Sequence, residues 1–492
     1  MRYTLFILFL LSSVCAFADN ATKPKPNVVF IMVDDLRTEL GSFGSKNAIS
    51  PNIDKLAEQG TLFKNAYVSV PVCGASRASL FTGMRATRKR FKNYFTSVEK
   101  DAPEAITLFE QFKKNGYQTM GFGKIFHVVQ DTAEKSWSSK QAWLPEIDKA
   151  MASVNVNSHH SRDYQSPINI QRYKATKQGP STEMVDVPDN AYFDGKLTQK
   201  AIEQLTNLSL AQKTEKAHFD KNQVTTEQPF FLAIGFVKPH LPFTAPKKYW
   251  DMYDPKQFKI PSNSLPIEAP KNAYHKFGEL RSYSDTPIAP EPVGDEQALR
   301  LIHGYHAAVS YVDAQVGLIL STLEDLGISD NTIVVLAGDH GYSLGEHGLW
   351  CKHSTFDLAT KAPLIIRTPN SKGGGVVDGL VEFIDIYPTL TELANIPTPN
   401  QVTGISLIPQ LTNPLLASRG AVFPRYHAAE AIRTAQYSLT QWFDKKGIVK
   451  AQMLYDHKND PDETVNLAND EKYETILENL SEQLQVHLKA RK

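Results

Sequence analysis

Short, continuous apolar runs recur along the chain, and segments with helical periodicity separate them. The runs lie at 27–36, 116–124, 229–236, 331–341 and 362–369. Runs of this length that do not alternate with polar residues are typical of strands buried on both faces of a parallel sheet. Apolar residues three and four positions apart predict a long helix from Glu296 to Leu326. The alternation of strands and helices predicts an α/β sandwich around a large, mostly parallel sheet.

The segment after the first run carries the start and stop signals of a helix. Ser50 stands at the N-cap position, Pro51 at the first helical position and Gly60 at the stop. We therefore expect a short helix between Pro51 and Gly60, with Ser50 as its cap.

Two parts of the chain differ from this pattern. Residues 128–229 are rich in Ser, Asn, Gln and Lys, which predicts loops and helices laid over one edge of the sheet, as a lid or specificity element. Residues 417–492 have the pattern of strands joined by a turn and a final helix from about Glu471 to Lys489, which predicts a small C-terminal α+β subdomain. Residues 19–416 would then form the main domain.

The N-terminus has the pattern of a secretory signal peptide. Arg2 precedes a short apolar run, and residues 16–18 form a small-x-small cleavage site. We therefore expect removal of residues 1–18 and export of the protein, to the periplasm or the medium, or to the lysosome in an animal cell. A lipoprotein anchor on Cys15 is the alternative. The run is too short to span a membrane, and no later apolar run is long enough.

Charge and cysteine content narrow the function classes. The 492 residues include 53 Lys and Arg and 53 Asp and Glu, so the net charge is zero. This balance argues against a general nucleic-acid binder but allows a local basic pocket. Of the three cysteines, only Cys73 and Cys351 remain after removal of the signal peptide. A single bridge between them is one interpretation. A chemical role for one of them is the other, because an exported protein of this size that relied on disulfides would carry more cysteines.

Two of the apolar runs end in residues that bind metals. Asp34 and Asp35 follow the first run, and Asp339 and His340 follow the fourth. In open α/β sheets the carboxyl ends of the strands face the ligand crevice, so these side chains are expected to converge on a divalent cation. Oxygen-rich ligands favour Ca²⁺ or Mg²⁺ over Zn²⁺. The alternative is that each Asp caps the loop or helix that follows it.

Cys73 stands where a helix is expected to begin. Arg77 follows one helical turn later, so both side chains are expected on one face. Free backbone N–H groups and the positive end of the dipole stabilise anions at such a position. We therefore expect Cys73 to have a depressed pKa or to be modified. The alternative is a small, inert, buried side chain.

The sequence CGASR from Cys73 to Arg77 resembles the Cys-x-Ala/Pro-x-Arg motif of type I sulfatases. Further blocks resemble that family in its order: VVFIMVDDLR, SPNIDKLAEQGTLFKNAY, GYQTMGFGKIFH, KPHLPF, GDHGYSLGEHGLWCKHSTFD and LYDHKNDPDETVNL. Together they extend over nearly the whole chain after the signal peptide. The residues in several of these blocks are most similar to those of the iduronate-2-sulfatase branch. The resemblance implies an alkaline-phosphatase-like α/β/α sandwich.

The resemblance also implies roles for individual residues. Cys73 would be converted to formylglycine, a hydrated aldehyde that attacks sulfate esters, and the cation would be Ca²⁺ rather than Mg²⁺. The implied metal positions are Asp34, Asp35, Asp339 and His340, together with the modified Cys73. The implied catalytic positions are Cys73, Arg77, Lys124, His127, His240 and Lys352, of which Lys124, His240 and Lys352 also hold the substrate. Arg88, in the basic run 85–94, is a candidate contact to the sugar, whereas the alternative for this run is a solvated cationic helix end.

These roles predict a sulfuric ester hydrolase that acts on sulfated carbohydrate. The substrates would be oligosaccharides from polysaccharides, including 2-O-sulfated uronic acid at a chain end. The protein partner would be a formylglycine-generating enzyme or an anaerobic sulfatase-maturating enzyme. Two alternatives are a phosphate or phosphonate monoester hydrolase on the same scaffold and a sulfated-glycan binder whose Cys73 is never converted.

Overall fold

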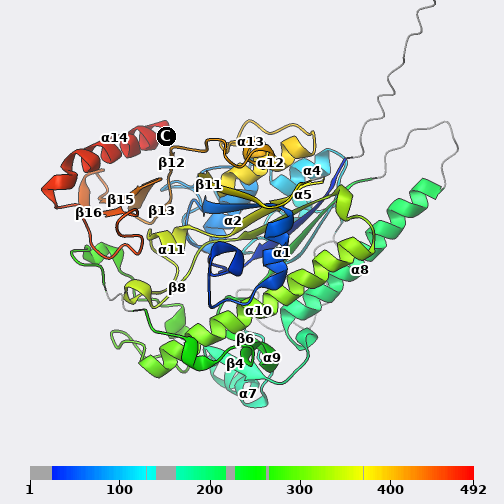
Figure 1. The fold of residues 1–492 in the computed structure, drawn as a ribbon, viewed down its shortest axis with the longest axis horizontal. Coiled ribbons are helices and arrows are strands. Elements are labelled where there is room, and N and C mark those ends of the chain that lie inside the picture. Colours follow the sequence, from blue (N-terminus) through cyan, green and yellow to red (C-terminus); the bar gives the residue numbers. More distant parts are fainter. Residues whose placement is uncertain are drawn as a thin grey trace, which may run out of the picture.

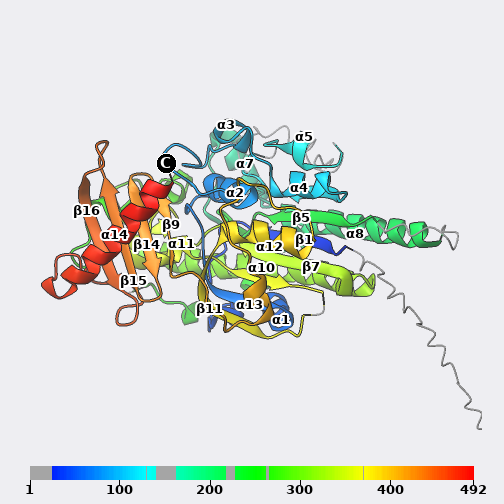
Figure 2. The same cartoon turned by 90° about the horizontal axis from the view of Figure 1, so that it is seen from above.

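A seven-stranded sheet lies at the centre of the molecule, with helices on both faces (Figure 1, Figure 2). The computed structural model describes residues 25–128, 130–139, 162–217, 228–261, 265–369 and 371–491, so the predicted signal peptide, residues 1–18, lies outside the described residues. Across the sheet the strands are β11 (Gly375–Glu382), β2 (Thr61–Tyr67), β10 (Leu364–Arg367), β7 (Thr332–Gly338), β1 (Asn27–Val33), β5 (Phe230–Phe236) and β3 (Gln118–Gly123). Each of the five predicted apolar runs contains one of these strands. The predictions missed β2 and β11, which exposed residues interrupt.

The sheet is mostly parallel, as predicted. Strands β1, β3, β5 and β7 pair in parallel, and so do β2 and β11. Only β10 among the seven is antiparallel, to both β2 and β7. The central strands β1, β5 and β7 are buried at every residue, because helices cover both faces.

The helices form two layers, one toward the top and one toward the bottom of the view in Figure 1. One layer contains α1 (Pro51–Gln59), α8 (Phe193–Ala217) and α10 (Asp295–Asp325), and the other contains α2 (Cys73–Thr82), α4 (Leu108–Lys114) and α12 (Ile386–Leu393). The long predicted helix is confirmed as α10. Its residues Val309, Val312 and Val316 are fully buried, as their spacing requires.

Helix α1 has the predicted bounds, and Ser50 is at the N-cap position as predicted. Its side chain makes no capping hydrogen bond, however, and its hydroxyl accepts instead from the backbone N–H of Gly41 at 3.0 Å. The carboxylate of Asp313 on α10 accepts from the N–H groups of Asn52 (3.1 Å) and Ile53 (2.8 Å). A residue from a distant helix therefore satisfies the first turn in place of the Ser50 side chain.

The polar segment contributes regular structure to one edge of the sheet. Its described residues contain α7 (Pro167–Thr176), β4 (Thr182–Val185) and α8. Strand β4 pairs in parallel with β6 (Phe243–Pro246), and α8 contacts β3 and β5 as well as α10. This segment is therefore part of the layered fold where the structure describes it.

The C-terminal part forms a separate antiparallel sheet covered by a helix, at the left of Figure 1. Its elements are β12 (Ala421–Val422), β13 (Arg425–Tyr426), β14 (Ala429–Thr434), β15 (Tyr437–Phe443), β16 (Val449–Asp456) and α14 (Glu474–Ala490). Ile432, Leu439 and Leu454 from the sheet pack with Leu480 and Leu484 from α14. The predicted C-terminal α+β subdomain is confirmed.

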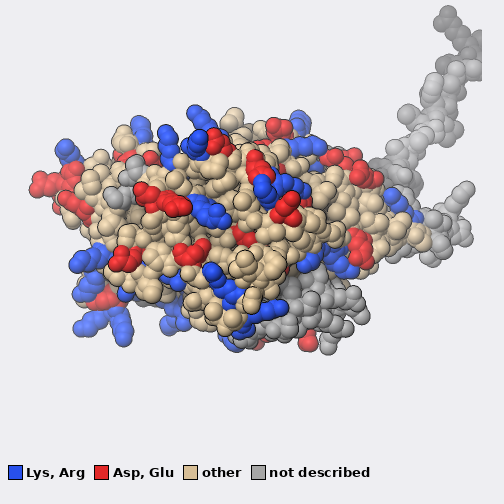
Figure 3. Space-filling view, turned by 90° about the horizontal axis from the view of Figure 1, so that it is seen from below, with Lys and Arg blue, Asp and Glu red and all other residues tan. Residues whose placement is uncertain are grey.

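Several short helices and strands connect the larger elements. The remaining helices and strands are α3 (Val98–Asp101), α5 (Ala133–Ser136), α9 (Lys247–Trp250), α11 (Asp357–Thr360), α13 (Ile408–Thr412), β8 (Ser343–Leu344) and β9 (Trp350–Cys351). Basic and acidic side chains are interspersed on the face shown in Figure 3. Within the described ranges, none of the helices combines the length and the apolar composition that crossing a bilayer requires.

Candidate active site

The carboxyl ends of β1 and β7 bring the predicted metal ligands together. The two strands are parallel neighbours, with Val33 opposite Gly338. Asp34 and Asp35 therefore emerge beside Asp339, and the backbone N–H of Asp35 donates to Asp339 Oδ1 at 2.9 Å. All three carboxylates are fully buried.

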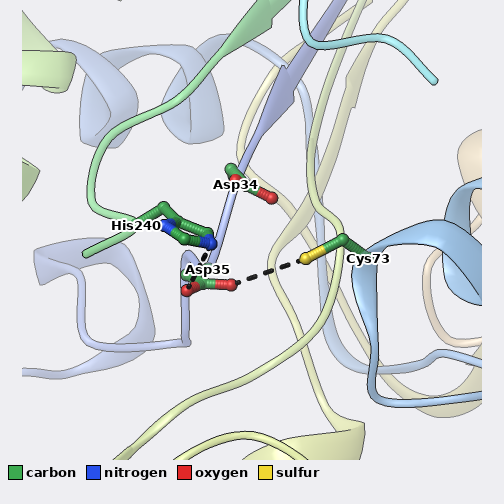
Figure 4. A group of neighbouring side chains, drawn as sticks. All are labelled: Asp34, Asp35, Cys73 and His240. Carbon is green, nitrogen blue, oxygen red and sulfur yellow. Dashed lines mark hydrogen bonds and ion pairs between the residues drawn. The ribbon is translucent and has the colours of Figure 1, made fainter. Parts of the chain in front are cut away.

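The backbone turns sharply at Asp35, directly after β1. Asp35 has a φ of 59°, in the left-handed region that Asp tolerates better than most residues. The hydroxyl of Tyr305 on α10 donates to the Asp35 carbonyl at 2.8 Å and accepts from the N–H of Arg37 at 2.9 Å. The turn lets consecutive carboxylates, Asp34 and Asp35, approach Cys73 from one side (Figure 4).

Cys73 is the first residue of α2 and lies against this carboxylate group. Its Sγ is 3.2 Å from His340 Nε2 and 4.0 Å from Asp35 Oδ1. Burial raises the pKa of the thiol well above its usual range, and the charge on Asp34 raises it further. The prediction of a depressed pKa is therefore wrong for the free cysteine. A thiol that stays protonated is a poor nucleophile, which leaves modification as the chemical interpretation.

The two cysteines described by the structure do not form a disulfide. Cys73 and Cys351 are both buried, free thiols. The interpretation that they form a single bridge is therefore wrong: Cys73 begins α2 and Cys351 lies on β9, without a bond between them.

Arg77 forms hydrogen bonds to the residues that follow β1 and β7 and to the loop after β3. Its Nε donates to Asp339 Oδ2 at 2.9 Å, and Nη2 donates to Asp34 Oδ1 at 3.1 Å. Its Nη1 donates to the carbonyls of Lys124 and Ile125. The side chain has no exposed surface. Arg77 thus neutralises two buried carboxylates that would otherwise repel each other.

Lys124 and His127 reach the site from the loop after β3. The ammonium group of Lys124 pairs with Asp34 Oδ2. Burial, and then the positive charge of Lys124, hold the pKa of His127 well below its usual range. A neutral imidazole next to the site is suited to accept a proton.

His240 and Lys352 lie next to Asp35. The Nζ of Lys352 donates to both Asp35 oxygens at 2.9 Å, and His240 Nε2 is 3.9 Å from Asp35 Oδ2. His240 Nδ1 lies 2.6 Å from the carbonyl of Leu241. The residues that the sequence predicted as catalytic or metal-binding therefore form one buried cluster, except that His127 is only half-buried.

Arg88 lies in a different environment. Its Nε donates to Glu430 at 3.2 Å, and its guanidinium stacks over the ring of Phe443 at 4.9 Å, both in the C-terminal sheet. Neighbouring Arg85 pairs with Glu382. Arg88 therefore joins the two parts of the fold, whereas the partner of Arg85 lies on β11 of the main sheet. A contact between Arg88 and the substrate stays a prediction.

Glu279 is a site residue that the sequence analysis missed. Its Oε1 lies 2.9 Å from His240 Nε2 and accepts from Lys352 Nζ at 2.8 Å. Burial alone would raise its pKa, but Lys352 and His240 hold the pKa well below the usual range. Glu279 comes from an irregular segment before α10 and belongs to no apolar period or motif, so no signal in the sequence distinguished it from a surface carboxylate.

The side chains present suit a hard divalent cation. Ligand atoms of Asp34, Asp35, Cys73 and His240 lie within 4.8 Å of one another, and so do those of Cys73, Asp339 and His340. Three buried carboxylates and an imidazole make an oxygen-rich set of the kind that Ca²⁺ and Mg²⁺ prefer.

Comparison with known proteins places this site in a family. A sequence model of the Sulfatase family matches residues 26–396, and a model described as N-sulphoglucosamine sulphohydrolase, C-terminal, matches residues 345–490. Iduronate 2-sulfatase of Homo sapiens is 32% identical over 441 residues, which cover 81% of this chain and 75% of the human protein.

Solved structures agree on the fold. A 2-O GAG sulfatase superposes with a TM-score of 0.65 at 23% identity, over 95% of this chain and 92% of its own. The phosphonate monoester hydrolase of Agrobacterium radiobacter gives a TM-score of 0.72 at 20% identity, over 95% and 96%. At these identities the likeness shows the fold alone, and it confirms the predicted alkaline-phosphatase-like sandwich. The family match over most of the chain, the identity to a sulfatase and the cluster around Cys73 together show that this chain belongs to the sulfatase family and is a sulfuric ester hydrolase.

Proposed function

We propose that this protein removes sulfate from sulfated oligosaccharides by means of a formylglycine formed from Cys73 and a bound Ca²⁺. The observation that carries the proposal is the position of Cys73. It begins α2 in a buried cluster where Arg77, Lys124 and Lys352 supply positive charge around the predicted metal ligands. Such a pocket is suited to an anionic ester with a reacting centre close to residue 73.

The cation would be held by Asp34, Asp35, Asp339 and His340, and when bound it would supply a fixed positive charge for the sulfate oxygens. Ca²⁺ is favoured over Mg²⁺ because it accepts irregular sets of oxygen ligands. The sulfur of Cys73 occupies the place of the oxygen that formylglycine would carry. As formylglycine, residue 73 would supply a hydrated aldehyde as nucleophile.

The remaining residues bind the ester and move protons. Lys124 and Lys352 flank Asp34 and Asp35 and are placed to hold sulfate oxygens. His240 and Lys352 both contact Glu279 and would protonate the oxygen of the leaving alcohol. His127, held neutral by burial, would accept a proton. Candidate acid and base groups at one site favour an enzyme over a sulfated-glycan binder.

The proposed substrate is a 2-O-sulfated uronic acid at the end of an oligosaccharide. The support is the identity to human iduronate 2-sulfatase, whose name states that position of the sulfate. The phosphonate monoester hydrolase alternative rests on a shared fold at 20% identity and has less support.

Maturation and export belong to the same proposal. Cys73 is 2% exposed, so a formylglycine-generating enzyme or an anaerobic sulfatase-maturating enzyme would have to reach it before the chain folds. Residues 1–18 would direct the protein to the periplasm or the medium.

The direct test is sulfate release from a panel of defined sulfated oligosaccharides, with phosphate monoesters assayed in parallel. We expect release from a sugar with a 2-O-sulfated terminal uronic acid, by protein whose Cys73 peptide has been shown by mass spectrometry to be converted. Converted protein that releases nothing from any sulfated sugar would contradict the proposal. Faster release of phosphate than of sulfate would favour the hydrolase alternative.

Removal of the cation provides a second prediction. Dialysis against a chelator is expected to lower the turnover number by about 10²-fold or more, because the sulfate oxygens lose their main positive partner. Added Ca²⁺ should restore activity and raise the thermal unfolding midpoint, since a ligand of the native state stabilises it. Metal analysis of the dialysed protein is the control. Full activity in protein shown to be free of metal would refute a catalytic cation.

A further inference from the structure

The carboxylate of Glu279 joins the two groups on the leaving-alcohol side of the site. A single atom, Oε1, lies 2.9 Å from His240 Nε2 and 2.8 Å from Lys352 Nζ. Asp35 contacts Lys352 at 2.9 Å but is 3.9 Å from His240, and it is also one of the predicted cation ligands. Among the residues that the structure describes, Glu279 is therefore the acidic side chain that contacts both groups at hydrogen-bond distance.

The contact to Glu279 defines the orientation of the His240 ring. His240 Nδ1 faces the carbonyl of Leu241 at 2.6 Å, and Nε2 faces Glu279 at 2.9 Å. The Leu241 carbonyl and the Glu279 carboxylate are both hydrogen-bond acceptors. These two opposed acceptors hold the ring in one rotation, with Nε2 directed at Glu279 Oε1, the atom that also contacts Lys352 Nζ.

Glu279 is itself firmly placed, although its segment is irregular. It precedes the short 3₁₀ turn Leu280–Ser282, and the Ser282 hydroxyl donates back to its carbonyl at 2.7 Å. Leu280 and Tyr283, on either side of that turn, are 1% and 4% exposed. Buried anchors therefore fix the backbone, and the carboxylate extends from them to the site.

The position of Glu279 relative to solvent matters for its role. Its side chain is 21% exposed, whereas that of Lys352 is 2% exposed and that of His240 is 5% exposed. Glu279 thus covers the pair from the solvent side. Its negative charge lies beside His240 and Lys352, the two groups that are proposed to protonate the leaving alcohol.

We propose that Glu279 is a positioning residue that holds His240 and Lys352 in the geometry for protonation of the leaving alcohol. The inference rests on the proposed function. A hydroxyl of the hydrated aldehyde at residue 73 forms a bond to sulfur and gives up its proton to His127, the proposed base. The sulfur–oxygen bond to the sugar breaks in the same step, and its electron pair stays on the sugar oxygen, which takes the proton from His240 Nε2. Glu279 acts through His240 by fixing the direction of that proton and through Lys352 by holding its ammonium beside the ring.

The test compares Glu279→Gln with Glu291→Gln, the same chemical change at an exposed carboxylate of the same segment. On the sulfated sugar that the wild type hydrolyses, E279Q is expected to lower kcat by about 10²-fold, the lower range for general acid catalysis, with KM changed by less than about threefold. Glu279→Asp should recover part of the loss, and E291Q should match the wild type. An E279Q kcat equal to that of E291Q overturns the proposal.

A double-mutant cycle separates positioning from a general structural effect. In a His240→Ala background, E279Q is expected to lower kcat by no more than about threefold, because the proton donor that Glu279 orients is gone and only its contact to Lys352 remains. A full 10²-fold loss in both backgrounds would show that Glu279 acts independently of His240 and would overturn the proposal.

Crystal structures of the wild type and E279Q give a readout that does not depend on activity. We expect the His240 ring to rotate or to occupy more than one conformer in E279Q. A single, unchanged His240 rotamer would overturn the inference even if no substrate had been found. A wild type that releases no sulfate from any sugar would instead count against the proposed function.

Discussion

Replacement of Cys73 by serine is expected to leave a protein that binds the sulfated sugar but releases sulfate at least about 10³-fold more slowly. Serine offers one hydroxyl, whereas the hydrated aldehyde proposed for residue 73 offers two, and the second is needed to free the product. The lysines, Arg77 and the predicted metal ligands are unchanged in this variant, so binding should persist. Ion chromatography measures the released sulfate, and calorimetry with the uncleaved sugar measures binding.

The matched control is Cys351→Ala, at the other buried free thiol. Cys351 lies on β9 and makes no disulfide, so this variant is expected to keep most of the turnover after a modest loss of stability. Equal activity of Cys73→Ser and the wild type would rule out residue 73 as the nucleophile. Equal loss in both cysteine variants would point to a general effect of thiol removal.

The parts of the site that sequence could predict are those attached to regular structure. Asp34 and Asp339 follow uninterrupted apolar runs, and parallel strands end at the same edge of a sheet, so their convergence follows from the pattern. Cys73 and Arg77 are one helical turn apart, which places them on one face of α2. In both cases a local pattern in the sequence, a strand end or one helical turn, predicts which side chains lie together.

Glu279 shows what such patterns cannot provide. It belongs to an irregular segment, and its partner Lys352 lies 73 positions further along the chain. Nothing local distinguishes it from Glu291, which is exposed. Arg88 illustrates the same limit, because its partner Glu430 is 342 positions away in the C-terminal sheet. Only the assembled fold determines these pairings.

The prediction of a depressed pKa for the Cys73 thiol was wrong because burial has a larger effect on the pKa than the helix dipole has. The helix dipole favours an anion at the N-terminus by about 0.3–1 kcal/mol. Full burial changes a pKa by up to about 3 to 5 pH units, and a change of one pH unit corresponds to about 1.4 kcal/mol. The sequence indicated where the helix begins but not how deeply Cys73 is buried or that the charge of Asp34 is adjacent. The prediction therefore included the helix dipole and left out the larger effect of burial.

Replacement of Arg77 by alanine is expected to lower the free energy of unfolding by about 3–5 kcal/mol, the range for breaking a buried ion pair from one side. The Arg77 side chain has no exposed surface and contacts Asp34 at 3.1 Å and Asp339 at 2.9 Å. Without it, two buried carboxylates lose a shared cation and the loop at Ile125 loses a hydrogen-bond donor. Urea denaturation of metal-free protein measures the change from the midpoint and slope.

Arg88→Ala is the matched control, because Arg88 also pairs with a carboxylate but its side chain is 40% exposed. Its removal should cost about 1 kcal/mol or less, as for other exposed pairs, and Glu430 keeps Arg425 and Arg491 as partners. Similar losses in the two variants would show that the buried position of Arg77 does not matter. Added Ca²⁺ sharpens the test: a cation bound by Asp34 and Asp339 replaces part of the missing positive charge, so it should stabilise Arg77→Ala more than it stabilises Arg88→Ala.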